Sequence, residues 1–254
     1  MTATSEPIFE IHDLGKSYGP KEVLRGLSFE IARGESLVVL GRSGSGKSVL
    51  LRQLNGLEKP DSGSVTFDGQ EITCLNERQL APIRRRVAML FQGGALFDSL
   101  TVGENVGFPL GEHTSLSADE IRREASHRLH LVGLDGVEDK APSDLSGGMR
   151  KRAALARSLA LDPEVILFDE PTTGLDPVTS ASIARLIRST QEQFSTTSVI
   201  VTHDLPLARK VGDRIAYLDE GRFRFLGTWA EADASTDREL TNFLAGRSEE
   251  VAVA

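Results

Sequence analysis

The residues best suited to chemistry in this chain form a glycine-rich segment at 41–48, which follows an apolar run at 36–40 and precedes a second apolar-rich run. Glycines let the backbone curl so that successive N–H groups point inward, and a helix that begins there adds the partial positive charge of its N-terminus. A strand, a glycine-rich turn and a helix start in this order predict a phosphate-binding loop for a nucleoside triphosphate. Lys47 would then reach the β- and γ-phosphates, and Ser48 would bind Mg²⁺. The residues predicted to line this loop are Gly41, Arg42, Ser43, Gly44, Ser45, Gly46, Lys47 and Ser48.

Polar side chains stand where three further apolar runs end, namely Asp169 with Glu170, then His203, and Gln92. The carboxyl ends of parallel strands meet at one edge of a sheet, so we expect these groups to face the same crevice as the phosphate loop. Phosphoryl transfer to water needs a metal near the phosphates, a group that orients the attacking water, and donors for the developing charge. We expect Asp169 to hold Mg²⁺ through its water shell and Glu170 to polarise the water. His203 would donate to the γ-phosphate, and the amide of Gln92 would touch both metal and water.

The elements that must position these groups are predicted from the spacing of apolar residues. Unbroken apolar runs predict strands buried on both faces, and segments with helical spacing lie between them, which together indicate a parallel sheet. The N-terminal segment alternates and contains repeated glycines, so we expect short antiparallel strands there. The predicted strands are 36–40, 64–69, 87–91, 165–168 and 198–202, and the predicted helices are 76–87, 149–161 and 178–194, with a mostly helical insert at 102–132 that contains a helix cap at Ser117.

Composition limits the class of protein. A chain of 254 residues with 39% hydrophobic residues can bury a substantial core. Its formal net charge of -8 argues against a nucleic-acid groove, because phosphate neutralisation normally needs a basic face. The single cysteine, Cys74, excludes a disulfide within the chain, and no apolar run approaches the roughly 20 residues that cross a bilayer. The first residues carry no signal-peptide pattern, so we expect the chain in the cytosol.

A second glycine-rich segment, Leu-Ser-Gly-Gly at 145–148, opens a predicted helix and is therefore a second candidate anion site. One nucleotide cannot fill both anion sites within one small domain. With this segment included, the chain resembles the nucleotide-binding domain of ATP-binding cassette (ABC) proteins from about residue 8 to residue 230. The resemblance rests on Tyr18, 41–48, Gln92, 145–149, 165–170, 174–176 and His203, which occur in this order.

This resemblance implies an α/β fold, a P-loop NTPase of ABC type with a mostly parallel RecA-like sheet core, an N-terminal antiparallel β subdomain and a helical subdomain. It implies one ABC ATPase domain over 8–245, with the helical subdomain at about 93–160 and a flexible C-terminal tail at 246–254. It also implies that the chain is an ATPase whose cofactors are ATP and Mg²⁺.

The resemblance further implies a head-to-tail homodimer, in which the segment 145–148 of one subunit completes the γ-phosphate site of the other. Asp176 would communicate across the dimer. Met149 stands where the family usually carries glutamine, and Arg42 stands where a proline is common. The additional ATP-binding residues implied by the family are Tyr18, which would stack on adenine, and Ser146, Gly147 and Gly148.

Within the family, the segments 89–100, 108–114 and 145–149 are similar to the ATPase subunit of Mla/Mce-type lipid transporters. This similarity implies transport of phospholipid or another lipid. It implies as partners an integral membrane permease, a substrate-binding Mce-type protein and a small regulatory subunit. The chain would then be peripheral on the cytoplasmic face of the inner membrane.

We expect the segment 92–110 to dock the permease, because it starts at Gln92 and carries apolar residues too interrupted for a core strand. Two other functions stay open: the ATPase subunit of an importer of amino acids or other small solutes, and a soluble ABC ATPase outside transport. The apolar residues expected at the docking surface are Ala95, Leu96, Phe97, Leu100 and Val102.

Overall fold

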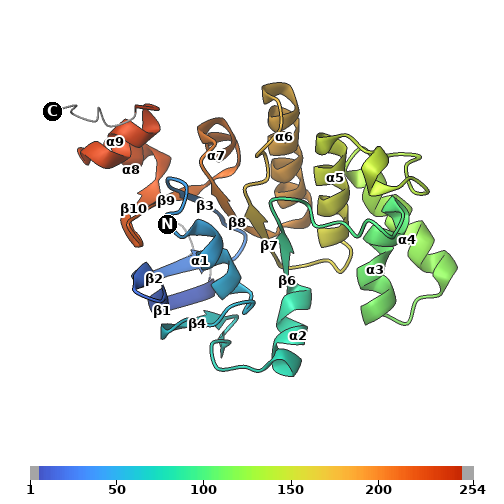
Figure 1. Cartoon of the computed structure of the whole chain (residues 1–254), viewed down its shortest axis with the longest axis horizontal. Coiled ribbons are helices and arrows are strands. Elements are labelled where there is room, and N and C mark those ends of the chain that lie inside the picture. The colour runs from blue at the N-terminus through green and yellow to red at the C-terminus, as the bar shows by residue number, and fades with distance from the viewer. Residues whose placement is uncertain (1–5, 248–254) are drawn as a thin grey trace.

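The computed structural model describes residues 6–247, which form two β-sheets and the helices around them (Figure 1). The smaller sheet is antiparallel, and residues 27–31 of its edge strand alternate between buried and exposed because one face covers the core. The prediction of antiparallel N-terminal strands is confirmed. The predicted tail lies outside the described residues from position 248 onward. The strands of this sheet, in the order β2-β1-β4-β5, are β1 (Pro7–Tyr18), β2 (Lys21–Ala32), β4 (Ser62–Phe67) and β5 (Gln70–Glu71).

The strand predicted at 64–69 ends earlier than expected. Asp68 and Gly69 adopt φ angles of 49° and 75°, which belong to the left-handed region. A strand cannot continue through this conformation, and the two residues instead form the turn between β4 and β5.

The larger sheet has the strand order β10-β9-β3-β8-β7-β6, and all neighbouring pairs are parallel except the edge pair β10 and β9. Every residue of β3, β7 and β8 is buried, which explains their unbroken apolar sequences. The carboxyl ends of β3, β6, β7 and β8 therefore meet at one edge, as predicted. The strands are β3 (Ser36–Leu40), β6 (Val87–Leu90), β7 (Val165–Asp169), β8 (Thr197–Thr202), β9 (Arg214–Asp219) and β10 (Arg222–Thr228).

Two hydrophobic cores cover opposite faces of this sheet. Leu37 and Val39 of β3 pack into one core together with Leu50 and the smaller sheet, whereas Val38 and Leu40 pack into the other. This division follows from the alternation of side chains along a strand. The helices that flank the sheet are α1 (Lys47–Leu54), α2 (Glu77–Arg86), α6 (Pro177–Phe194), α7 (Leu205–Val211), α8 (Trp229–Asp233) and α9 (Arg238–Leu244).

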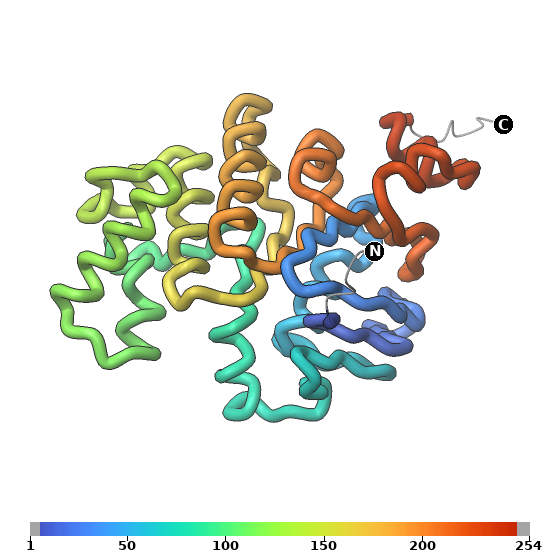
Figure 2. The backbone as a smooth tube through the Cα atoms, turned by 180° about the vertical axis from the view of Figure 1, so that it is seen from behind, coloured from blue at the N-terminus to red at the C-terminus, as the bar shows by residue number. Residues whose placement is uncertain are grey.

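The predicted helical insert lies at the end of the molecule away from α8 and α9 (Figures 1 and 2). Ser117 and Glu120 form a capping box at the start of α4, so the predicted cap is confirmed. The helix predicted from 149 begins at Gly147, because Ser146 accepts the backbone N–H of Met149 and caps it. Within residues 6–247, no helix is both long and apolar enough to span a bilayer. The elements are α3 (Val102–His113), α4 (Ala118–Leu131), a 3₁₀ turn (Pro142–Asp144) and α5 (Gly147–Ser158).

Candidate nucleotide-binding site

The glycine-rich segment 41–48 connects the end of β3 to the start of α1, as the sequence predicted. Gly44 and Gly46 have φ angles of 79° and 107°, which side-chain-bearing residues rarely adopt. A Cβ atom on Gly46 would also lie 2.9 Å from the carbonyl oxygen of Val23. The curl of the loop therefore needs glycine at these positions. The loop borders a pocket of about 520 Å³, which is lined by Val23, Arg42, Ser43, Gly44, Gly46, Lys47, Ser48, Val49, Gln92, Glu170, Thr173 and His203.

The amine of Lys47 lies inside the loop and is almost fully buried. It donates to the carbonyl oxygens of Gly41 at 2.9 Å and Arg42 at 3.1 Å, and it lies 3.5 Å from Oε1 of Glu170. Phosphate oxygens can replace these acceptors without leaving the ammonium unpaired. The lysine is thus held at the phosphate loop, where its charge favours an anionic ligand.

Ser48 and Asp169 place two oxygen ligands beside the loop. The hydroxyl of Ser48 donates to Oδ1 of Asp169 at 2.8 Å, and Asp169 ends β7 in a largely buried position. Burial raises the pKa of Asp169, as does the neighbouring Glu170 carboxylate, while the Ser48 hydrogen bond opposes the rise. A hydroxyl and a carboxylate suit Mg²⁺, which usually keeps several waters and takes its other ligands from nucleotide phosphates. Within residues 6–247, no cluster of three or more His, Cys, Asp or Glu side chains able to hold a metal occurs.

The burial of Asp169 leads to a stability prediction. Because the folded-state pKa is raised, the ionised carboxylate costs stability at neutral pH, and this cost is relieved as pH falls through the raised pKa toward the ordinary 3.8. Asp169→Asn keeps an acceptor for Ser48 and removes the buried charge. We expect the nucleotide-free variant to be more stable at pH 7 by about 1 kcal/mol, which raises Tm by about 2–4 °C. Magnesium-dependent stabilisation by ATP should be lost. Thermal unfolding with and without Mg-ATP measures both effects, and a lower apo Tm would contradict the account.

Glu170 and His203 meet because β7 and β8 are neighbouring parallel strands. Nδ1 of His203 lies 2.9 Å from Oε2 of Glu170, and the hydroxyl of Thr202 donates to the same oxygen at 3.4 Å. Glu170 has a φ angle of 47°, and its N–H donates to the carbonyl of Val201 at 3.0 Å. The backbone therefore holds a non-glycine residue in the left-handed region, a form of strain found where a side chain must point at a ligand.

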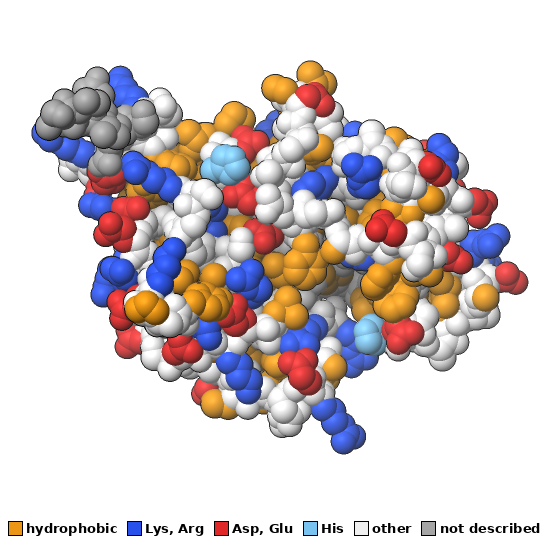
Figure 3. Space-filling model, viewed as in Figure 1, with side chains coloured by type: hydrophobic (Ala, Val, Ile, Leu, Met, Phe, Trp, Pro, Cys, Tyr) orange, Lys and Arg blue, Asp and Glu red, His pale blue; other side chains and the backbone are white. Residues whose placement is uncertain are grey.

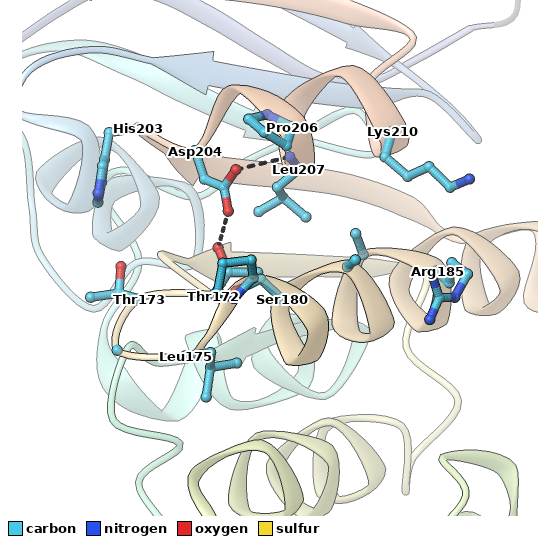
Figure 4. A pocket seen from close by; sticks show the side chains of 14 residues that line it. Thr172, Thr173, Leu175, Ser180, Arg185, His203, Asp204, Pro206, Leu207 and Lys210 are labelled. Atoms are coloured by element: carbon cyan, nitrogen blue, oxygen red, sulfur yellow. Dashed lines mark hydrogen bonds between the residues drawn. The ribbon is translucent and has the colours of Figure 1, made fainter. Parts of the chain in front are cut away.

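Figure 4 shows two hydrogen bonds that hold Asp204, the residue after His203. The hydroxyl of Thr172 donates to Oδ2 of Asp204 at 2.8 Å, and Oδ1 of Asp204 accepts the N–H of Leu207 at 3.0 Å and caps α7. These bonds tie the segment after β7 to the start of α7. His203 and Thr173 line both the phosphate-loop pocket and a neighbouring cleft of about 570 Å³ between α6 and α7.

Gln92 lies at the end of β6 with an exposed side chain that lines the phosphate-loop pocket. Its backbone carbonyl accepts a hydrogen bond from the amine of Lys151, which comes from the buried face of α5. The sequence analysis missed Lys151. The available signal was its position three and four residues before Ala154 and Leu155, which places it on the inner side of the predicted helix.

This pocket is not lined by the predicted residues Tyr18, Ser146, Gly147, Gly148 and Asp176. Tyr18 is 47% exposed, and its hydroxyl donates to Glu58. Ser146 and the glycines after it begin α5 and do not line the phosphate-loop pocket. Asp176 caps α6 by accepting the N–H groups of Val178 and Thr179, and the hydrogen bond from the Thr179 hydroxyl lowers the pKa of Asp176. One chain thus brings together the phosphate loop, Gln92, Asp169, Glu170 and His203, but not the second anion site.

A family profile described as ABC transporter matches residues 24–173. The chain belongs to the ABC transporter family. It is 43% identical to the probable ribonucleotide transport ATP-binding protein mkl of Mycobacterium leprae (strain TN), over 94% of this chain and 69% of that protein. It is 42% identical to the methionine import ATP-binding protein MetN of Brucella abortus (strain 2308), over 86% of this chain and 59% of that protein. The chain therefore spans between 59% and 69% of the length of these two relatives.

Solved ABC cassettes share the fold. The ATP-binding cassette MJ0796, in a dimeric post-hydrolysis state bound to ADP and Pi, superposes with a TM-score of 0.81 at 35% identity, covering 87% of this chain and 98% of that one. CbiO1 of Clostridium perfringens superposes with a TM-score of 0.81 at 32% identity, covering 90% of this chain and 91% of that one. The predicted ABC-type P-loop fold, the ATPase activity and the cofactors ATP and Mg²⁺ are confirmed.

Proposed function

We propose that this ABC ATPase is the energy-coupling subunit of a membrane transporter and works as a head-to-tail homodimer. The observation that carries the dimer is the separation of two anion sites in one chain. The segment 145–148 begins α5, yet none of its residues lines the pocket around Lys47. The two anion sites can bind the same nucleotide if a second copy of the chain places its segment 145–148 beside the phosphate loop of the first. MJ0796 was solved as a dimer, which supports the same arrangement.

Within each site, we assign the chemistry by position. Lys47 binds the β- and γ-phosphates, and Ser48 and Asp169 hold Mg²⁺, which neutralises phosphate charge when bound. The carboxylate of Glu170 accepts a hydrogen bond from the attacking water. His203, whose Nδ1 lies 2.9 Å from Glu170, donates a hydrogen bond to the γ-phosphate. Tyr18 stacks on adenine, and Asp176 contacts the partner site. The side-chain amide of Gln92 contacts both the metal and the attacking water from the edge of the pocket.

The permease-docking surface is proposed to combine two exposed phenylalanines with a basic groove. The rings of Phe97 and Phe108 pack with centroids 5.0 Å apart and are 45% and 43% exposed. The Arg157 guanidinium lies 5.7 Å from the Phe97 ring centroid and donates to the carbonyls of Ala95 and Gly94. Hydrophobic, basic and histidine side chains gather on this face between α2 and α3 (Figure 3). The groove, of about 340 Å³, is lined by Ala81, Arg84, Arg85, Pro109, His113, Arg157, Ser158 and Leu161.

This surface corrects part of the sequence prediction. Val102 is fully buried as the first residue of α3, and Leu96 packs against the core, so neither is available as a docking residue. Phe108, which belongs to the predicted segment 92–110 but was not named among its docking residues, is exposed because it lies on the outer side of α3. The groove carries three arginines and a histidine, so the partner helix should present carboxylates as well as apolar side chains.

We expect Phe97→Asp combined with Phe108→Asp to release the permease while ATP binding is kept. Burial of each ring in a partner cleft contributes about 1.5–3 kcal/mol, and both contributions are lost. Co-purification of the membrane subunit in detergent and nucleotide affinity measure the two outcomes. Leu57→Asp is the matched control, since Leu57 is also 45% exposed but belongs to the segment after α1. Retention of the permease by the double variant would remove this surface from the docking site.

The proposed cargo is phospholipid or another lipid, moved together with an Mla/Mce-type permease on the cytoplasmic face of the inner membrane, with an Mce-type binding protein and a small regulatory subunit. The resemblance of 89–100 and 145–149 supports this cargo. A second candidate is an importer of small solutes, and the similarity to a methionine importer and a ribonucleotide transport protein favours it.

Co-purification of the native membrane subunit, followed by reconstitution in proteoliposomes, separates the two cargoes. ATP-dependent movement of labelled phospholipid is expected. Movement of labelled methionine or ribonucleotide, with no lipid movement, would replace lipid by the small-solute alternative.

A further inference from the structure

Lys151 is a buried cation for which the proposed reaction has so far given no role. It belongs to α5 and is 8% exposed, and no ion pair links it to a carboxylate within residues 6–247. Its amine instead donates to the backbone carbonyl of Gln92 and, at 3.5 Å, to the backbone carbonyl of Glu170. A lysine placed only for packing would not need an ammonium at this position, because burying that charge is costly.

The surroundings of Lys151 make this arrangement specific. The side chain lines a cavity of only about 10 Å³ together with Leu90, Leu155 and Phe168, so apolar groups surround its stem. Burial lowers the pKa of Lys151, while Asp169 and Glu170 oppose that shift. The ammonium is therefore retained by the two carbonyls and by the field of the catalytic carboxylates.

These contacts join three parts of the transport cycle. Lys151 lies five residues, or about 1.4 helical turns, beyond Ser146, whose segment meets the nucleotide of the other subunit in the proposed dimer. Gln92 begins the segment that leads to the docking surface, and Glu170 carries the catalytic carboxylate of the same chain. A shift of α5 is transmitted to the backbones of Gln92 and Glu170, because Ser146 caps the same rigid helix that carries Lys151.

We propose that Lys151 is a positioning residue, which couples the helix that contacts the partner's nucleotide to the backbone of Gln92 and Glu170 in its own chain. The inference rests on the proposed roles of Glu170 and of the segment 145–148. It adds a connection within one subunit between the two nucleotide sites of the dimer.

The test compares Lys151→Met and Lys151→Gln in the 254-residue chain. Met keeps the length and apolar stem of the side chain but donates to neither carbonyl, so turnover should fall by about tenfold or more while ATP affinity stays within about threefold. Gln offers a neutral donor and should restore part of the loss. Lys140→Met is the control, because it makes the same exchange at an exposed position in the helical region.

A structural readout separates positioning from general stability. In Lys151→Met, amide hydrogen exchange should rise at 92–95 and 170–173, with Tm close to the parent value, and ATP should no longer slow exchange in both segments together. Unchanged exchange in both segments, or full turnover of Lys151→Met, would overturn the coupling role. Glu170→Gln measured in parallel tests the catalytic assignment separately, since its failure would leave the exchange result for Lys151 unaffected.

Discussion

Replacement of Glu170 by glutamine is expected to lower steady-state ATP turnover by about 10²–10⁴-fold, because an amide cannot accept a proton from the attacking water. Glutamine has nearly the same size, so the contact with Thr202 and the neighbouring His203 position should persist. ATP binding should be kept or strengthened, since a negative charge 3.5 Å from the Lys47 amine is removed from a site that receives phosphates. The variant should accumulate as a closed dimer that retains two nucleotides.

Steady-state phosphate release, nucleotide stoichiometry after gel filtration, and dimer mass together measure this prediction. Glu112→Gln is the control, because Glu112 is an exposed carboxylate on α3. Normal turnover in Glu170→Gln would remove Glu170 from the catalytic role. Loss of ATP binding together with loss of turnover would show instead that the carboxylate is needed to shape the pocket.

Lys47→Ala and Ser146→Arg should each abolish turnover alone and complement one another in a heterodimer. Lys47→Ala removes the phosphate-binding amine, and Ser146→Arg blocks the anion site at the start of α5. In a mixed dimer, the intact phosphate loop of one subunit meets the intact segment 145–148 of the other, so one complete site remains. With random pairing of equal amounts, half of the dimers are mixed, and about a quarter of all sites are complete.

Crosslinked heterodimers should therefore occlude one nucleotide each, whereas neither homodimer should occlude any. Ser146→Ala is a useful companion, because it removes the cap at about 0.5–2 kcal/mol without adding bulk and so separates loss of stability from blockage of the site. Normal hydrolysis by Ser146→Arg homodimers would exclude shared sites. Absence of occlusion in heterodimers whose subunits are folded would do the same.

At the proposed docking surface, residue type alone does not predict which apolar side chains are exposed. Ala95, Leu96, Phe97, Leu100 and Val102 form one apolar run in the sequence, yet Val102 is buried and Phe97 is 45% exposed. The sequence contains no signal that separates them, because both occur at the boundary between a loop and a helix that packs on α4 and α5. Only the way in which that helix lies on its neighbours decides which side chains face outward.

The sequence by itself determined the phosphate loop, the buried parallel strands and the polar groups at their ends. These features depend on residues adjacent in the chain: a strand, a glycine turn with φ of 107° at Gly46, and the helix start at Lys47. Strand ends then share one edge because parallel strands require it, which brings Asp169 within 2.8 Å of Ser48 although 121 positions separate them.

Only the tertiary structure decided the contacts between residues far apart in the chain, which neither hydrophobic periodicity nor a sequence motif predicts. Lys151 reaches the carbonyl of Gln92 across 59 positions, and Tyr18 donates to Glu58 across 40. Each contact depends on the angle at which a helix or hairpin packs against its neighbour, and that angle is set by the combined shape of many side chains. The same packing leaves Ser146 outside the pocket of its own phosphate loop. The physical reason is that hydrophobic periodicity specifies which face of an element is buried, but not which residue of a distant element it meets there.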